Sequence, residues 1–376
     1  MFTTMDKYRI DSHKYSFHPI HSSTVLNYLH DRSSPDARDA YLSQHPLYIE
    51  VSPVGACNHR CTFCAVDYIG YKSTFMDIDT YKTSINSMIN RGCKAIMFAG
   101  EGEPLLHPSI NEFVRYTKEV GNIDVSFTTN AVKLTKDFVE KSLGLTSWMK
   151  ISFNAGTPST YARIHRTKES DFDIVSENIR RAVAYKKENG IDCTIGLQTL
   201  LLPDNAETIE QLCIHARGLG VDYLVIKPYS QHKFSDTEIY KDVDYEPYIN
   251  LGSTLEKYNS ADFNVIFRVN TIKNWLSQNN QRYCKCLATP SAWAYWMASG
   301  DVYSCSAYLL DDRFKLGNIK ESSFDEIWKS ETRRKNSDFV LDELDISECR
   351  VNCRMDQVNR YLDSVHGQTI PHINFI

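Results

Sequence analysis

Short apolar segments alternate with amphipathic helical patterns from residue 47 to residue 229. The apolar segments are rich in β-branched or aromatic residues, which is typical of strands, and they cover 47–53, 95–100, 123–130, 148–154, 193–201 and 223–229. The helical patterns between them include 79–90, 109–119 and 173–188. Six strand–helix units in a row form parallel strands with right-handed crossovers. The sequence therefore predicts an α/β fold, either an open doubly wound sheet or an incomplete barrel.

Three other stretches carry local expectations. Residues 204–207 have the spacing of a capping box, which predicts a helix that runs through Ala216 and stops at Gly218. Residues 230–247 are polar, with two Tyr and a Pro, and predict a surface loop. Residues 1–46 show weak periodicity and are interpreted as an extension that wraps the barrel.

Polar residues end the predicted strands. In parallel α/β folds, ligands bind at the carboxyl ends of the strands, where the loops meet. We therefore expect the functional site among these residues, which are Glu101, Glu103, Thr129, Asn130, Ser152, Asn154, Gln198, Lys227 and Tyr229.

Charge and hydropathy restrict the partners of the chain. Its 376 residues include 42 Lys and Arg against 47 Asp and Glu, a net charge of −5, which argues against nucleic acid or an anionic membrane surface as a partner. No apolar run approaches the ~20 residues of a spanning helix. The first residues lack the apolar stretch of a secretory signal. These features predict a cytoplasmic protein.

The cysteines fall into two groups and a scatter. A cytoplasmic chain with eleven cysteines, an odd number, does not read as a disulfide framework. Three lie close together, namely Cys57, Cys61 and Cys64. Cys93, Cys193 and Cys213 are isolated and are taken as buried apolar residues. Five come late in the chain, namely Cys284, Cys286, Cys305, Cys349 and Cys353. Two groups indicate two metal sites.

The first group has the pattern CxxxCxxC and directly follows the first predicted strand. Three thiolates in one loop can face a metal cluster from one side. A structural zinc site or a closed four-iron cluster wants four protein ligands, so three leave one metal position open for a substrate or cofactor. The alternative is a zinc loop completed by His59 or a distant cysteine.

This motif resembles that of the radical S-adenosylmethionine (SAM) enzymes. The resemblance implies a partial (β/α)6 TIM barrel in which Cys57, Cys61 and Cys64 are the catalytic cluster ligands, binding three irons of a [4Fe-4S] cluster while the fourth iron chelates SAM. It also implies a 5'-deoxyadenosyl radical that abstracts hydrogen from the substrate, and a flavodoxin- or ferredoxin-type electron donor.

Further positions match the family's SAM-binding segments. Phe63 matches an aromatic position near the adenine, and the AGEGE sequence that ends the second strand resembles the turn that receives the methionine amino group, with an extra acidic residue at Glu101. The resemblance implies SAM contacts by Phe63, Gly100, Glu101, Gly102, Glu103, Asn130, Ser152, Asn154 and Arg166. For Ser152, Asn154 and Arg166 the alternative is a strand-end cap or a surface charge.

The late cysteines resemble the SPASM and twitch domains. Thirteen residues separate Cys286 from Gly300, and four more precede Cys305, which fits the cysteine hairpin of those domains. With Cys349 and Cys353, this implies four ligands of one auxiliary [4Fe-4S] cluster, as in the shorter twitch form. Cys284 is left over, as an exchangeable ligand, a hydrogen-atom donor or a packed side chain. The predicted division is a 1–46 extension, a 47–275 barrel, a 276–360 auxiliary-cluster domain and a 361–376 tail.

The substrate is expected to be small and carbohydrate-derived. Polar residues at and beyond the strand ends, including Gln198, Lys227 and Arg268, suit a hydroxyl-rich or phosphorylated molecule. The segments 353–361 and 371–376 resemble those of a bacterial group associated with surface glycans, which implies a sugar or nucleotide sugar that is dehydrogenated, epimerised or deoxygenated. Two alternatives stay open, a peptide or protein maturase of the same chemistry and a non-enzymatic iron–sulfur electron carrier.

Overall fold

A computed structural model of the protein describes residues 6–277, 283–367 and 371–372. Parts of the predicted 1–46, 276–360 and 361–376 segments, namely 1–5, 278–282, 368–370 and 373–376, lie outside the described residues. In the described part of the chain no helix combines the length and apolar character that crossing a bilayer needs. The boundaries of the four predicted segments stay a prediction.

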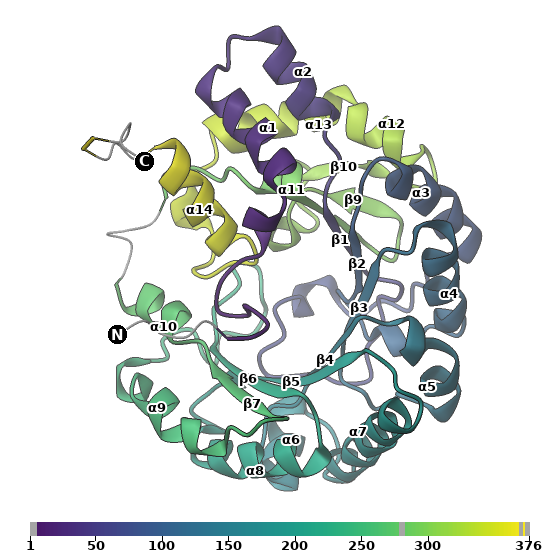
Figure 1. Ribbon diagram of the computed structural model, residues 1–376, viewed down its shortest axis with the longest axis vertical. Coiled ribbons are helices and arrows are strands. Elements are labelled where there is room, and N and C mark those ends of the chain that lie inside the picture. The colour runs from purple at the N-terminus through teal and green to yellow at the C-terminus, as the bar shows by residue number, and fades with distance from the viewer. Residues whose placement is uncertain (1–5, 278–282, 368–370, 373–376) are drawn as a thin grey trace.

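Seven parallel strands curve around the centre of the molecule, with helices on the outside (Figure 1). The strands are β1 (Tyr48–Val51), β2 (Ala95–Phe98), β3 (Asp124–Thr129), β4 (Trp148–Ser152), β5 (Thr194–Leu201), β6 (Tyr223–Pro228) and β7 (Asn264–Phe267). The helices of this part are α3 (Ile78–Asn90), α4 (Ile110–Gly121), α5 (Lys136–Ser142), α6 (Pro158–His165), α7 (Ser170–Glu188), α8 (Ile209–Leu219), α9 (Leu251–Leu255) and α10 (Val269–Leu276). The predicted partial barrel and its six strands are confirmed, and β7 is an additional strand.

The C-terminal part continues the same sheet. Strand β8 (Trp293–Trp296) pairs in parallel with β1, with Tyr48 opposite Trp293, and β9 (Asp301–Tyr303) and β10 (Lys315–Asn318) follow in antiparallel order. Its helices are α11 (Thr289–Ala292), α12 (Phe324–Lys329), α13 (Glu331–Asp342) and α14 (Asp356–His366). The hairpin that contains Cys305 is thereby fixed to the first barrel strand.

Residues 19–43 form two helices, α1 (Pro19–His30) and α2 (Pro35–Ser43), which pack against the C-terminal helices. Arg32 pairs with Asp342, and Arg38 pairs with Asp338 on α13. Short 3-10 helices complete the chain at Tyr15–Phe17, Asp67–Ile69, Pro104–Leu106, Leu143–Leu145, Ala206–Thr208, Glu246–Tyr248, Glu256–Tyr258, Ser306–Tyr308 and Ile346–Glu348.

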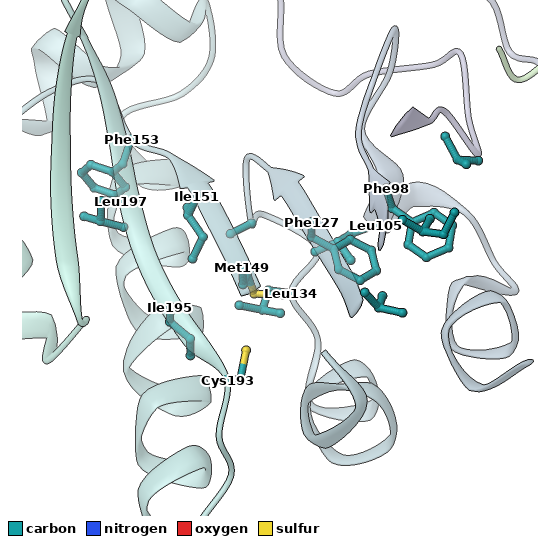
Figure 2. Close-up of a cluster of buried hydrophobic side chains, with 14 of the residues drawn as sticks. Phe98, Leu105, Phe127, Leu134, Met149, Ile151, Phe153, Cys193, Ile195 and Leu197 are labelled. Carbon is teal, nitrogen blue, oxygen red and sulfur yellow. The ribbon is translucent and has the colours of Figure 1, made fainter. Parts of the chain in front are cut away.

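Alternate residues of each barrel strand face the helices and form the main apolar core. Phe98, Phe127, Met149, Ile151 and Leu197 lie in one buried cluster between the strands and helices (Figure 2). Because side chains alternate along a strand, the residues between them, such as Lys150 and Ser152, point into the barrel. The interior of the barrel is therefore polar enough to hold a ligand.

One local prediction is wrong, and another is confirmed only in part. The capping box at 204–207 does not form, because the Asp204 carboxylate accepts a hydrogen bond from Tyr240 instead, and α8 begins at Ile209. That helix continues past Gly218 and ends before Gly220, which adopts the left-handed conformation. The 230–247 stretch has no helix or strand up to the 3-10 turn that begins at Glu246, and many of its residues are exposed, as predicted, but His232, Tyr240 and Tyr245 are buried and anchor it.

Candidate active site

The loop after β1 places the three clustered cysteines at the carboxyl end of the barrel. Its backbone is tied to the end of α6, since Arg60 N donates to His165 O at 3.2 Å and Thr62 N donates to Ile164 O at 2.9 Å. The 230–247 segment holds it from the other side, where Ser235 Oγ donates to Cys64 O at 3.1 Å. The sulfur-bearing loop is therefore fixed by two elements that are distant in the sequence.

A cavity of about 350 Å³ lies against these cysteines. It is lined by most of the residues that the sequence predicted for the SAM site, which are Cys57, Cys61, Cys64, Phe63, Gly100, Gly102, Glu103, Asn130, Ser152 and Asn154. Glu101 and Arg166 do not line it. The structure thus gathers ten of the twelve predicted residues around one space, and their individual roles stay predictions.

The glycine turn after β2 packs directly on the cysteine loop. A Cβ added to Gly102 would lie 2.2 Å from Val54 O and 2.4 Å from Ala56 O, and one added to Gly100, which has a φ of +117°, would lie 2.5 Å from Ser52 Cβ. Glu103 N also donates to Ala56 O at 2.9 Å. Glycine is required here because two backbone segments meet without room for a side chain.

The two acidic residues of this turn have different surroundings. The Glu103 carboxylate accepts hydrogen bonds from Thr129 Oγ1, Asn130 N and Leu105 N at 2.5, 2.7 and 3.0 Å. Glu101 points to the C-terminal hairpin, where it accepts from Ala298 N at 3.0 Å. Burial raises the pKa of each carboxyl to about 7.

His165 is a site residue that the sequence analysis did not select. Its Nε2 accepts from Asn154 N at 3.3 Å, so the ring proton lies on Nδ1, which is 3.3 Å from Cys61 Sγ. Burial lowers the pKa of this imidazole well below its usual value, so the ring is neutral. His165 therefore donates to a predicted cluster ligand.

Arg166 lies away from the cavity. It ends α6 as a C-cap with a φ of +47°, which turns its side chain into solvent. A contact between Arg166 and SAM stays a prediction.

The second group of cysteines also converges. Burial raises the pKa of Cys353 to about 12, and the neighbouring Cys286 and Cys349 raise it further. Burial likewise raises the pKa of Cys305, which faces the same three residues. The Tyr308 hydroxyl oxygen lies 3.3 Å from Cys349 Sγ, and Asn359 Nδ2 donates to Cys286 Sγ at 3.5 Å. Cys284, in contrast, is exposed.

The spacing of the sulfurs fits clusters better than single metal ions. Among the described residues, no three cysteine sulfurs lie within 4.8 Å of one another. Tetrahedral zinc with Zn–S bonds of ~2.3 Å requires sulfurs about 3.8 Å apart. A closer group in the described chain is His59, Cys61 and His165, but it includes only one of the three cysteines and His59 is paired with Asp171. The sulfurs of both cysteine sets are therefore spaced more widely than one zinc ion requires.

Family models match both halves of the site. The radical SAM superfamily model matches residues 51–215, and the SPASM model, an iron–sulfur cluster-binding domain, matches residues 284–354.

The chain is also similar in sequence to curated proteins. A tungsten-containing aldehyde ferredoxin oxidoreductase cofactor-modifying protein of Pyrococcus furiosus is 24% identical over 302 residues, which are 76% of this chain and 81% of that protein. GTP 3',8-cyclase of Chlorobaculum tepidum is 30% identical over 193 residues, which are 50% of this chain and 55% of the cyclase. The chain thus spans about half the length of the cyclase.

Solved structures share the fold. SuiB of Streptococcus suis, in a complex with the precursor peptide SuiA, has a TM-score of 0.60 at 16% identity and covers 78% of this chain and 69% of its own. Native anSMEcpe with bound AdoMet has a TM-score of 0.56 at 17% identity, and the match covers 85% of this chain and 95% of anSMEcpe. With its [4Fe-4S] and SAM site and its auxiliary iron–sulfur site, the chain belongs to the radical SAM superfamily and carries a C-terminal SPASM-type domain.

Proposed function

We propose that the protein reductively cleaves SAM and abstracts a hydrogen atom from a small, carbohydrate-derived substrate. The proposal rests on the cavity that touches three cysteines, the glycine turn and the polar strand ends together. When bound, the cluster and SAM supply one electron and a 5'-deoxyadenosyl radical. A non-enzymatic electron carrier needs neither an open three-cysteine site nor a cavity beside it.

Several residues of the chain would together bind the cluster and SAM. Cys57, Cys61 and Cys64 would bind the cluster and leave one iron open. Gly100 and Gly102 would let the backbone approach the ligand closely, with Glu103 near the methionine ammonium. Phe63, Asn130, Ser152, Asn154 and the more distant Glu101 and Arg166 complete the proposed SAM set.

The enclosure of the cavity supports a small polar substrate. A second cavity of about 430 Å³ shares Gln198, Lys227 and Asn352 with the first. Tyr8, Arg9, Ile10, Ser12, His13 and Lys14 line the second cavity, and Ser230 and His232 line the first. Amide and ammonium groups suit hydroxyl and oxyanion groups, so the interior fits a sugar or nucleotide sugar. A cytoplasmic setting is also proposed, because none of the eleven cysteines forms a disulfide.

The first experiment measures SAM cleavage. Protein reconstituted without oxygen is given SAM and a reductant, either dithionite or a flavodoxin- or ferredoxin-type donor, and 5'-deoxyadenosine is quantified. The C57A/C61A/C64A variant is expected to lose about four irons and all cleavage. The control variant C349A/C353A should lose the auxiliary cluster and keep the first. No 5'-deoxyadenosine from the intact protein, or cleavage that survives in the triple variant, contradicts the proposal.

The second experiment identifies the substrate class. Deuterated sugars, nucleotide sugars and peptides are tested for deuterium transfer into 5'-deoxyadenosine. Transfer from a sugar compound supports the proposed function. Transfer only from peptides would favour a peptide maturase. This alternative is tested because the fold resembles that of SuiB, which was solved with a precursor peptide.

A further inference from the structure

Two lysines inside the barrel, between the two cysteine groups, form no hydrogen bond or ion pair with the part of the chain that the structure describes. Lys150 is the third residue of β4 and Lys227 the fifth of β6, and both line the second cavity, together with Cys305 and Cys353 of the auxiliary group. Lys227 also lines the cavity that touches Cys57, Cys61 and Cys64. These two side chains, which we call the lysine pair, therefore lie where a substrate of the proposed enzyme would be held.

Each of the three arginines around the lysine pair has a protein partner. Arg354 Nη2 pairs with Glu50 Oε2 at 2.6 Å, and Arg268 Nε pairs with Asp11 Oδ1 at 3.3 Å. Arg350 donates to Ser230 O at 3.1 Å. Within the described chain, neither lysine has an ion pair or hydrogen bond, and Lys150 Nζ lies over the Trp148 ring, 4.9 Å from its centroid.

The surroundings of the lysine pair disfavour its charge in the absence of a ligand. Burial, together with the positive charges of Arg354, Arg268 and Lys14, lowers the pKa of Lys150 to about 7, while Glu50 opposes them. Burial also lowers the pKa of Lys227 well below its usual value, with Lys150 and the three arginines adding to it. Although the chain has a net charge of −5, this interior cavity is lined by Lys150, Lys227, Arg268, Arg350 and Arg354, and the charged form of the lysines is disfavoured there without a counter-ion. An anion in the cavity would remove this cost.

We propose that the lysine pair, with Arg268, Arg350 and Arg354 around it, is the subsite for a phosphate or diphosphate group of the substrate. This inference rests on the proposed function, because it assigns a substrate class to the same cavity. Two ammonium groups on separate strands are both neutralised only by an anion with at least two negative charges. A phosphate group carries such a charge, and a single carboxylate does not. Gln198 on β5, between the two lysine strands, lines both cavities and would bind a neighbouring hydroxyl.

The competing explanation is that these cations balance the negative charge of the auxiliary cluster. It suits Arg350 and Arg354, whose charges interact with the Cys353 thiolate. It accounts less well for the lysine pair, because Lys227 also lines the cavity at Cys57, Cys61 and Cys64, and the Lys150 ammonium lies over the Trp148 ring.

Calorimetric titration of the reconstituted, SAM-loaded enzyme with inorganic pyrophosphate tests the proposal. The intact enzyme is expected to bind it, and Lys150→Gln and Lys227→Gln are each expected to weaken binding at least tenfold. Lys133→Gln, which removes an exposed lysine from a loop, should bind as the intact enzyme does. Undetectable binding, or binding unchanged in both variants, overturns the proposal, and so does malonate binding as tightly as pyrophosphate.

Iron content and SAM cleavage of the same variants separate the possible failures. Cluster balancing would shift the reduction potential of the auxiliary cluster in Lys150→Gln and Lys227→Gln and leave pyrophosphate affinity unchanged. Loss of SAM cleavage in the intact enzyme would instead refute the proposed function, whatever the pyrophosphate result.

Discussion

His165 shows how a single buried side chain can influence the first cluster. Its Nδ1–H faces Cys61 Sγ at 3.3 Å, and a hydrogen bond to a cluster sulfur stabilises the reduced cluster, whose sulfurs carry more negative charge. We expect His165→Phe to lower the reduction potential of this cluster by on the order of tens of millivolts. Redox titration followed by electron paramagnetic resonance measures it.

Two matched variants make the His165 result specific. His165→Asn keeps a donor and should recover part of the potential. His215→Phe removes another histidine, one that is bonded to Ser176 on the outer helices, and should leave the potential unchanged. Equal potentials in His165→Phe and the intact enzyme would show that the imidazole only fills space.

Lys150 predicts a pH dependence of anion binding. Without an anion its pKa is about 7, lowered by burial and by Arg354, Arg268 and Lys14, with Glu50 opposing them and Lys227 nearby. A bound anion raises this pKa, so binding takes up a proton at neutral pH. Sulfate affinity should be greatest below pH 7 and should fall by up to ~tenfold per pH unit above it. Titration calorimetry across this range measures the slope, which Lys150→Gln should reduce; an equal slope in that variant would contradict the assignment.

At the scale of elements, the turn after β2 and the loop after β1 form one unit. Gly102→Ala would bring a methyl group within 2.2 Å of Val54 O, so the cysteine loop must move. We expect a loss of about 1–3 kcal/mol in the free energy of unfolding and loss of SAM cleavage. Chemical denaturation and the 5'-deoxyadenosine assay measure the two effects.

Gly218→Ala is the control for this element. A Cβ at Gly218 meets no atom within 4 Å, and the residue lies inside α8, so the change should stabilise the protein by about 0.4–1 kcal/mol with unchanged activity. Normal SAM cleavage by Gly102→Ala would mean that the turn tolerates displacement.

The sequence predicted those elements whose signal is local. Six barrel strands coincide with apolar runs of the sequence, whereas β7 (Asn264–Phe267), which is as long as β1 and β2, follows a polar stretch and was missed. The 204–207 capping box failed because Asp204 finds Tyr240, a partner that only the folded chain supplies. Lys150 and His165 were missed for a similar reason. The role of Lys150 depends on the strand face that points into the barrel, and the role of His165 depends on the cysteine loop that packs beside it in the folded chain.

At the scale of the whole molecule, the pairing of β8 with β1 joins the two cluster regions into one sheet. No local pattern predicts this pairing, because it links residues some 245 positions apart, as in the pair Val51 and Trp296. The Cys57 loop follows β1, and the β8–β9 hairpin that precedes Cys305 begins on β8, the strand beside β1. This arrangement explains how the interior cavities reach both cysteine groups.

Shared strands predict that the two regions unfold together. Trp296 is completely buried between β1 and α12, with its ring 5.3 Å from that of Phe324, so Trp296→Ala should cost about 3–5 kcal/mol. If the sheet is one cooperative unit, the melting temperature falls by several degrees and both clusters release iron at the same lower temperature. Calorimetry and iron release to a chelator measure this, with the exposed Ile214→Ala as the control. Release of auxiliary iron at a lower temperature than the rest would instead mean that the C-terminal part opens alone, and that β8 binds β1 too weakly to couple the two sites.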